Sequence, residues 1–187
     1  MPILLQDALG ELPFIAEDLG VITPDVEALR DDFGFPGMRV LQFAFSKDAT
    51  DLNLPHNYVQ NVVAYTGTHD NNTAVGWFNS AGEESTHNAQ QCKRERDFCL
   101  QYLNTSGDEI NWDFIRAVSA SVANTAIIPL QDVLGLGAEA RMNLPNTKEG
   151  NWLWRIKQRS LNSELAARLK DLTDLYGREH KNVPGRV

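Results

Sequence analysis

Two segments of this chain place carboxylates directly after short apolar runs. In PFIAEDLG, Glu17 and Asp18 follow residues 13–16, and in NVVAYTGTHDNNT, His69 and Asp70 follow a second run. In parallel α/β proteins, catalytic groups lie at the carboxyl ends of strands, where the βα loops converge on one face. Two acids brought together there can cleave glycosidic bonds, one as general acid and the other as nucleophile or base. Glycoside chemistry is therefore the leading hypothesis.

The same residues also have structural interpretations. Glu17 and Asp18 could cap the turn after a strand, and Asp70 could form a turn within the polar THDNN sequence. A lone histidine such as His69 often only donates to a backbone carbonyl. The residues alone leave these alternatives open.

Composition excludes some classes of function. The chain has 187 residues, enough for one domain with a sizeable core, and its net charge of -8 argues against nucleic acid, whose phosphates require Lys and Arg. No apolar run reaches the ~18 residues of a membrane span, and the start is unlike a signal peptide. Cys92 and Cys99 would lie roughly 10 Å apart along one helix, too far for a disulfide, and lack a zinc-like spacing. We therefore expect reduced thiols, no metal, no cofactor and a cytoplasmic location.

Apolar periodicity and turn residues predict alternating strands and helices. Strands are expected at residues 13–17, 38–43, 61–66 and 125–130. Helices are expected at residues 3–12, 23–33, 112–122 and 163–176, with a long, mostly helical region at 74–104. Thr23 is expected to cap one helix that Gly34 ends, and Asn111 to cap another. Such a pattern fits either a small doubly wound sheet or part of a barrel, and periodicity does not choose between them.

Three stretches resemble one family, that of 4-α-glucanotransferase, also called amylomaltase or disproportionating enzyme, in the α-amylase-like clan of glycoside hydrolases. They are AEDLGVITPDVEALRDDFGFPGMRVLQFAF, YTGTHDNNTAVGWF and IIPLQDVLGLGAEARMNLPNTKEGNWLWR. The resemblance runs from about Leu9 to Arg155 in consistent order. It implies an α/β fold, the C-terminal half (strands 5 to 8 with helices) of a TIM (β/α)8 barrel. Residues 1–187 would then form a single partial catalytic domain with a mostly helical excursion at about 74–123.

The resemblance also implies roles for particular residues. Glu17 falls where the family carries its general acid/base, and Asp70 where it has a third carboxylate. That third group binds sugar hydroxyls and favours the oxocarbenium-like transition state. His69 resembles the neighbour that hydrogen-bonds the same sugar, and Asn143 and Phe43 resemble positions that line the glucan cleft. The implied reaction transfers α-1,4-glucan segments between maltooligosaccharides or starch- and glycogen-type glucans.

The family's nucleophile is an aspartate on the fourth barrel strand, and no segment of this sequence matches that strand. A retaining mechanism needs an attacking carboxylate roughly 5 Å from the acid, so we expect the isolated chain to be inactive or nearly so. Unpaired sheet edges would favour self-association or pairing with the missing half. Two alternatives remain: a non-catalytic glucan-binding remnant, or an unrelated doubly wound α/β protein in which Glu17 and Asp70 are structural.

Some positions depart from the family pattern or carry a second interpretation. Asn72 stands where relatives often have an acid. Asn146 replaces a frequent glycine, and asparagine is the next most tolerant residue of a positive φ. Trp77, Trp152 and Trp154 could stack on sugar rings, although packing beneath loops is the commoner fate of tryptophan.

Overall fold

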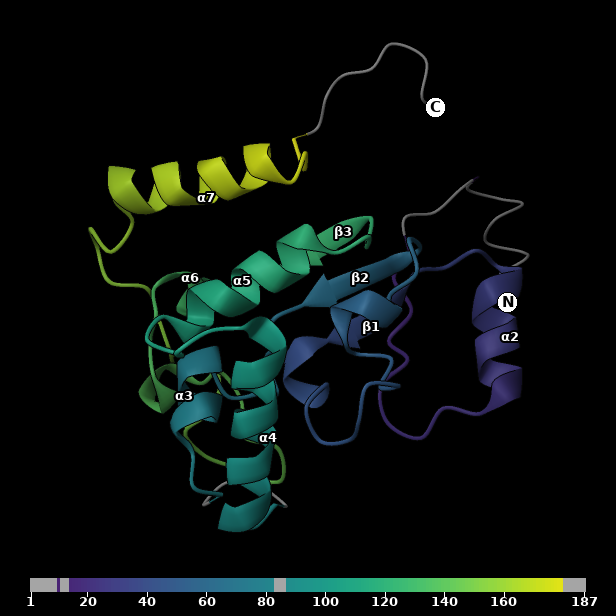
Figure 1. Ribbon diagram of the computed structural model, residues 1–187, viewed down its shortest axis with the longest axis horizontal. Coiled ribbons are helices and arrows are strands. Elements are labelled where there is room, and N and C mark those ends of the chain that lie inside the picture. The colour runs from purple at the N-terminus through teal and green to yellow at the C-terminus, as the bar shows by residue number, and fades with distance from the viewer. Residues whose placement is uncertain (1–9, 11–13, 83–86, 180–187) are drawn as a thin grey trace.

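A computed structural model of the chain describes residue 10 and residues 14–82 and 87–179. Within them, three short strands form a parallel sheet in the order β1-β2-β3 (Figure 1). The strands are β1 (Gly37–Val40), β2 (Val62–Tyr65) and β3 (Thr125–Ile127). Because all three are parallel, their carboxyl ends lie at the same edge of the sheet, and the loops that follow them meet there.

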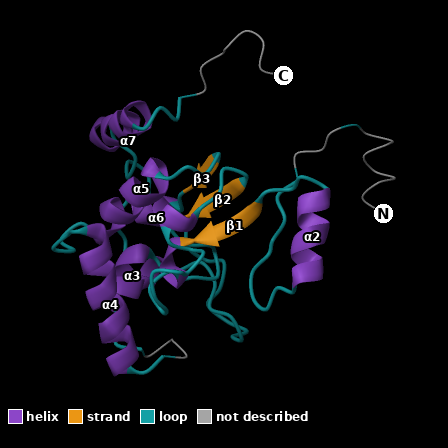
Figure 2. Ribbon diagram, turned by 45° about the vertical axis from the view of Figure 1, so that its right-hand side comes forward, coloured by secondary structure: helices purple, strands orange, loops and turns teal. Residues whose placement is uncertain are grey.

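Six helices surround this sheet in the described part of the chain. They are α2 (Pro24–Asp32), α3 (Ala74–Asn79), α4 (Ala89–Leu103), α5 (Ile110–Ala120), α6 (Leu130–Val133) and α7 (Ser163–Leu175). Short 3-10 turns add η1 (Leu41–Phe43), η2 (Pro55–Asn57) and η3 (Ala138–Ala140). Figure 2 shows α3 to α6 on one side of the sheet and α2 on the other, beyond β1. No residue of α2 is buried.

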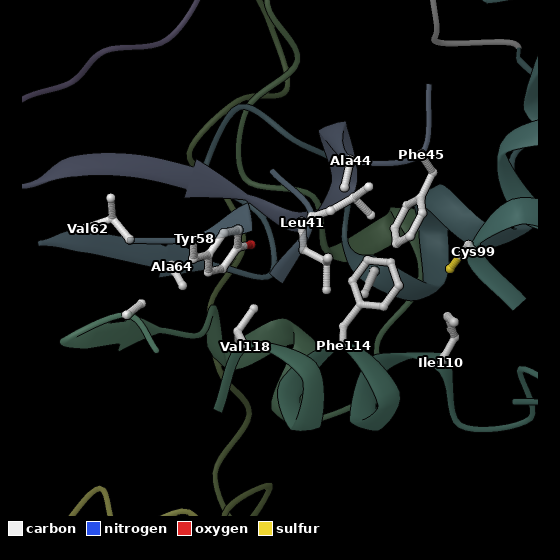
Figure 3. Close-up of a cluster of buried hydrophobic side chains, with 13 residues drawn as sticks. Leu41, Ala44, Phe45, Tyr58, Val62, Ala64, Cys99, Ile110, Phe114 and Val118 are labelled. Atoms are coloured by element: carbon white, nitrogen blue, oxygen red, sulfur yellow. The ribbon is translucent and has the colours of Figure 1, made fainter. Parts of the chain in front are cut away.

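The main core lies between the sheet and α5. Ile110, Phe114 and Val118 recur at a spacing of four, which places them on one face of that helix, and all three are buried. Figure 3 shows Phe114 and Val118 pointing toward the strand residues and toward Leu41. The Phe114 ring also packs against Phe45, at a centroid distance of 5.9 Å. This apolar layer fixes the sheet against α5 and so sets the platform for the strand ends.

Helix α7 packs on α5 through a small apolar cluster that includes Trp112, Ile115 and Leu172, and an ion pair adds to it. The Arg168 guanidinium donates to both carboxylate oxygens of Glu109 at 2.7 Å and lies 4.0 Å above the Trp112 ring. Beyond α7, Arg178 donates to backbone carbonyls at the C-terminal end of α5, including those of Val118 and Ser121. These bonds satisfy carbonyl groups that the helix itself leaves without donors.

The expected strand at residues 13–17 is wrong for the described residues, 14–17. They lie outside the sheet, with one backbone bond from Ala16 N to the Pro36 carbonyl at 2.9 Å. The Met38 N–H of β1 is bonded instead by a side chain, the Asp18 Oδ1 atom at 2.6 Å. A carboxylate thus takes the place of a strand carbonyl, and the described sheet has three strands rather than four.

Two other strands are shorter than expected. The strand predicted at 38–43 ends at Val40, because the Ala44 N–H bonds to the Leu41 carbonyl at 3.0 Å and closes η1. The strand predicted at 125–130 ends at Ile127, shortly before Pro129, which has no N–H to continue a ladder.

Most expected helix positions are confirmed. Helix α2 follows Thr23 and is ended at Gly34, which has a φ of 65°, although the Thr23 side chain makes no capping bond. Asn111 does not cap α5; it lies inside the helix and is buried. The helix expected at 3–12 lies outside the described residues.

Candidate active site

The structure brings Glu17 and Asp70 to the same cavity, which has a volume of about 770 Å³ and lies against the sheet. Its walls include Met38, Tyr65 and Ile127, one residue from each strand. The loops that follow the strands complete it, as expected for the carboxyl ends of parallel strands. An arrangement with the two acids on opposite faces of the sheet, as an unrelated fold would allow, is therefore not observed.

Asp18 anchors the chain next to Glu17. The Asp18 side chain is only 6% exposed and accepts a bond from Arg30 Nη1 at 2.5 Å as well as from the Met38 N–H. These bonds fix the backbone at Asp18, directly after Glu17. Glu17 is exposed and lines the cavity. Asp18 therefore has a structural role, which is one of the two interpretations that the sequence allowed.

Tyr65, the last residue of β2, shares the cavity with Glu17. Burial, with a smaller contribution from the charge of Glu17, raises the pKa of the Tyr65 phenol. The phenol therefore stays protonated at neutral pH and presents a neutral polar group to the cavity.

Residues 66–73, the β2–α3 loop, carry both His69 and Asp70. Asn71 Oδ1 accepts bonds from the Thr68 N–H at 2.9 Å and from its hydroxyl at 2.8 Å. The Asn71 N–H returns a bond to the Thr68 carbonyl at 3.2 Å. This closed turn leaves the side chains of His69 and Asp70 about half exposed, at 54% and 50%. Both can therefore reach a ligand.

The loop leaves the strand at Gly67, close to the side chain of Gln42. A Cβ at Gly67 would lie 2.5 Å from Nε2 of the buried Gln42. That same Nε2 donates to the Asn72 carbonyl at 2.8 Å. The side chain of Gln42 thus supports the loop, and a larger residue at position 67 would displace the Gln42 amide.

Asp70 is held by a segment distant in sequence. Asn143 Nδ2 donates to Asp70 Oδ1 at 2.6 Å, and the Asn143 N–H donates to the His69 carbonyl at 3.1 Å. Arg141 Nη2 donates to the Asp70 carbonyl at 2.7 Å, while its Nε donates to the Asn143 carbonyl at 2.9 Å. The structure therefore unites Asp70, His69 and Asn143 as one cluster. Arg141 was not among the predicted site residues, although it lies in the same quoted stretch as Asn143.

Trp152 is a further residue beside this cluster. Its ring lies 5.1 Å from the His69 ring, centroid to centroid, and the residue is 52% exposed. Trp77 differs, because its ring packs against Phe45 and Phe114. Of these two tryptophans, Trp152 offers the accessible aromatic face near Asp70.

Phe43 forms part of the wall between two cavities. It lines the cavity shared by Glu17 and Asp70 and also a second one of about 400 Å³, and its side chain is 42% exposed. The predicted residues Glu17, Asp70, His69 and Phe43 therefore all line the same cavity, and Asn143 reaches it through its bond to Asp70.

Other features of the described residues bear on the sequence expectations. Asn146 has a φ of 66°, the conformation that a glycine would favour at this position. Cys92 and Cys99 are both free and both lie in α4. No group of three potential metal ligands occurs among the residues described, and none of the described helices has the length and apolar character to cross a membrane.

The sequence comparison decides the family. Residues 2–162 match the family described as 4-alpha-glucanotransferase. This chain belongs to the 4-α-glucanotransferase family. Among curated relatives, the 4-alpha-glucanotransferase of Synechocystis sp. is 52% identical over 177 residues, which cover 93% of this chain and 33% of that protein. The 4-alpha-glucanotransferase of Thermus thermophilus is 46% identical over 178 residues, which cover 91% of this chain and 34% of that protein. The chain thus spans about a third of the length of these relatives.

Solved structures agree with this assignment. The amylomaltase from Streptococcus agalactiae in complex with acarbose superimposes with a TM-score of 0.82 at 36% identity, covering 92% of this chain and 33% of that one. The amylomaltase from Corynebacterium glutamicum, with a TM-score of 0.62 and 17% identity, shares the fold. The mixed α/β fold with its small parallel sheet is therefore that of part of an amylomaltase.

Proposed function

We propose that this chain supplies the acid/base and glucan-binding part of a 4-α-glucanotransferase, which moves α-1,4-glucan segments between maltooligosaccharides or starch- and glycogen-type glucans. The observation that carries the proposal is the common cavity of Glu17 and Asp70, in a chain of this family. A retaining reaction requires two proton transfers at one oxygen position and stabilisation of positive charge on the sugar ring. The cavity offers one carboxylate for each of these tasks.

Glu17 performs the proton transfers in this proposal. It protonates the departing glycosidic oxygen, and it then removes the proton from the acceptor hydroxyl that attacks the glycosyl-enzyme. Its exposure to the cavity and the anchoring of the neighbouring Asp18 support this role.

Asp70 binds sugar hydroxyls and favours the distorted, oxocarbenium-like sugar. His69 Nε2 lies 3.3 Å from Asp70 Oδ1, and Asn143 bonds to the Asp70 carboxylate and to the His69 carbonyl, which suits a shared sugar subsite. The exposed ring of Phe43 provides an apolar surface against which a pyranose can pack.

The attacking carboxylate belongs, in this proposal, to a part of the barrel that these residues do not match. The isolated 187-residue chain should then be inactive or nearly so. The chain would form the C-terminal half of a (β/α)8 barrel, as one partial catalytic domain with the helices between residues 74 and 123 as its excursion. The parallel order β1-β2-β3 and the likeness to an amylomaltase support this arrangement.

Pairing with the remainder of a barrel, or self-association, also follows from this arrangement. Helix α2 has no buried residue, and its Val26 and Leu29 are 43% and 56% exposed. Burial of such residues against another surface is favourable. Light scattering of the purified chain should therefore show a mass above that of a monomer. We keep the cytoplasmic location as a prediction; the Arabidopsis thaliana relative is named as chloroplastic or amyloplastic.

A chimera tests the transferase proposal. This chain would replace the matching third of the Synechocystis relative, and glucose release from maltotriose would be measured. The chimera should be active, Glu17→Gln should reduce its activity by about 10²- to 10⁴-fold, and Glu27→Gln on the exposed face of α2 should not. An active Glu17→Gln chimera would refute the assignment. If the isolated chain binds maltotetraose and the chimera makes no product, the chain is instead a glucan-binding remnant.

A further inference from the structure

Asp132 is a buried carboxylate that connects the two ends of the β2–α3 loop. It lies in α6 and is only 1% exposed. The hydroxyl of Thr66, at the start of the loop, donates to Asp132 Oδ2 at 2.5 Å. The N–H of Ala74, directly after the loop, donates to Oδ1 at 2.7 Å. Each carboxylate oxygen therefore holds one end of the loop.

The carboxylate is itself fixed in place. Asn111 Nδ2, from α5, donates to the Asp132 carbonyl at 2.8 Å. Burial raises the pKa of the Asp132 carboxyl, and the bonds from Ala74 and Thr66 oppose that rise. A buried carboxylate is costly unless it is hydrogen-bonded, and an apolar residue here would leave the Ala74 N–H without this acceptor. Its placement is therefore explained by the two bonds that it makes to the loop.

The loop is held from two sides. Arg141 and Asn143 bond to its outer part at Asp70, and Asp132 bonds to its ends from behind. Asp132 borders a small hollow of about 160 Å³ together with His69 and Trp152, and it is absent from the lining of the cavity that holds Glu17 and Asp70. It can therefore set the loop's position without touching a glucan in that cavity.

We propose that Asp132 is a positioning residue, which holds the β2–α3 loop so that His69 and Asp70 face the glucan cavity. The expected effect of Asp132 on sugar binding rests on the proposed function, whereas its effect on the loop rests on the structure alone. Small displacements of such groups weaken binding and catalysis strongly, which is why supporting bonds matter at a site of this kind.

The test compares Asp132→Ala and Asp132→Asn in the whole chain. Amide hydrogen exchange would be measured over the β2–α3 loop and Ala74, and maltotetraose affinity would be measured by calorimetry. Asp132→Ala should speed exchange there and weaken binding, each by about tenfold, since the buried Ala74 N–H and Thr66 hydroxyl both lose their acceptor. Asp132→Asn keeps an oxygen for the Ala74 N–H and should stay within about threefold of the original chain.

Asp51→Ala is the matched control. Asp51 is also buried, at 5% exposed, and accepts the Asn53 N–H at 2.8 Å, but it does not line the glucan cavity. It should leave exchange in the β2–α3 loop unchanged. Equal effects of Asp51→Ala and Asp132→Ala on the loop, or unchanged exchange in Asp132→Ala, would overturn the proposal.

Two further outcomes are separated by design. If Asp132→Ala does not fold, Thr66→Val removes one of the two bonds and is measured by the same exchange experiment; unchanged loop exchange there overturns the proposal. If the original chain binds no maltotetraose, the proposed function is decided by the chimera with the Synechocystis relative, while loop exchange still decides whether Asp132 positions the loop.

Discussion

Asn143 Nδ2 lies 2.6 Å from Asp70 Oδ1, although 73 positions separate the two residues in the chain. The amide is a neutral donor, so it orients the carboxylate while leaving its negative charge in place. The same residue bonds to the backbone of His69, which ties the segment after η3 to the β2–α3 loop. This contact is the main reason to treat the loop and that segment as one site.

Replacing Asn143 with aspartate should therefore be more harmful than replacing it with alanine. Asn143→Ala loses one bond, whereas Asn143→Asp places two carboxylates within hydrogen-bond distance, where they repel. We expect maltotetraose affinity at pH 7 to fall further in Asn143→Asp, and to recover partly near pH 4 as a proton is shared. Calorimetry at the two pH values measures this. Asn124→Asp, at an exposed position, serves as control; identical pH responses of the two aspartate variants would contradict the account.

Asp132 should make stability depend on pH. Burial raises the pKa of this carboxyl above its ordinary value of about 3.8, so the folded chain holds a proton that the unfolded chain releases. That stabilisation is fully present below about pH 3.8 and is lost as the pH rises through the folded-state pKa. The free energy of unfolding of the original chain, minus that of Asp132→Asn, should thus decrease as the pH rises from about 3 to 7. Urea titrations at several pH values would show this; a difference that increases with pH would contradict it.

Phe114 should dominate the stability of the core. It is fully buried and its ring packs against Phe45 and Trp77. Phe114→Ala should lower the free energy of unfolding by about 3–5 kcal/mol, because it removes apolar contacts and leaves a cavity. Val122→Ala, at a residue 56% exposed, should change it by less than about 0.5 kcal/mol. Chemical denaturation measures both, and equal losses would mean that the core lies elsewhere.

A conservative change at Arg168 should weaken the packing of helix α7 on α5. Lysine lacks the planar fork that bonds both oxygens of Glu109 and stacks less well on Trp112. The ion pair is largely exposed, so Arg168→Lys should cost only about 1 kcal/mol. Amide hydrogen exchange should become faster only in α7 and in the part of α5 that it contacts. Arg94→Lys on α4 is the control, and similar exchange in both variants would argue against the role of Arg168.

Local pattern was sufficient for most helices and for the position of Asp70. Parallel strands bring their following loops to one edge, which places Asp70 after β2 at the cavity, whereas Glu17 reaches the same cavity from a segment that is not a strand. Local pattern wrongly predicted a strand at residues 14–17. The Met38 N–H of β1 bonds to the Asp18 side chain instead of to a neighbouring strand. The pairing of the Met38 N–H depends on this contact between residues 20 positions apart, which apolar periodicity does not reveal.

The supporting residues were beyond sequence reasoning for a similar reason. Arg141 contacts the Asp70 carbonyl across 71 positions, and Asp132 contacts Thr66 across 66. Neither contact leaves a local signal in spacing or composition. Trp152 could be named as a tryptophan near a resembling stretch, but only the fold places it beside His69.

The role of Glu17 as general acid is tested most directly by changing the leaving group. In the chimera with the Synechocystis relative, Glu17→Ala would be assayed with maltotriose and with α-maltosyl fluoride, whose fluoride leaves without protonation. We predict a loss of about 10²- to 10⁴-fold with maltotriose and a much smaller loss in the first turnover of fluoride release, which precedes the step that needs Glu17 as base. Equal losses with both substrates, or no loss with either, would contradict the assignment of Glu17 as the acid.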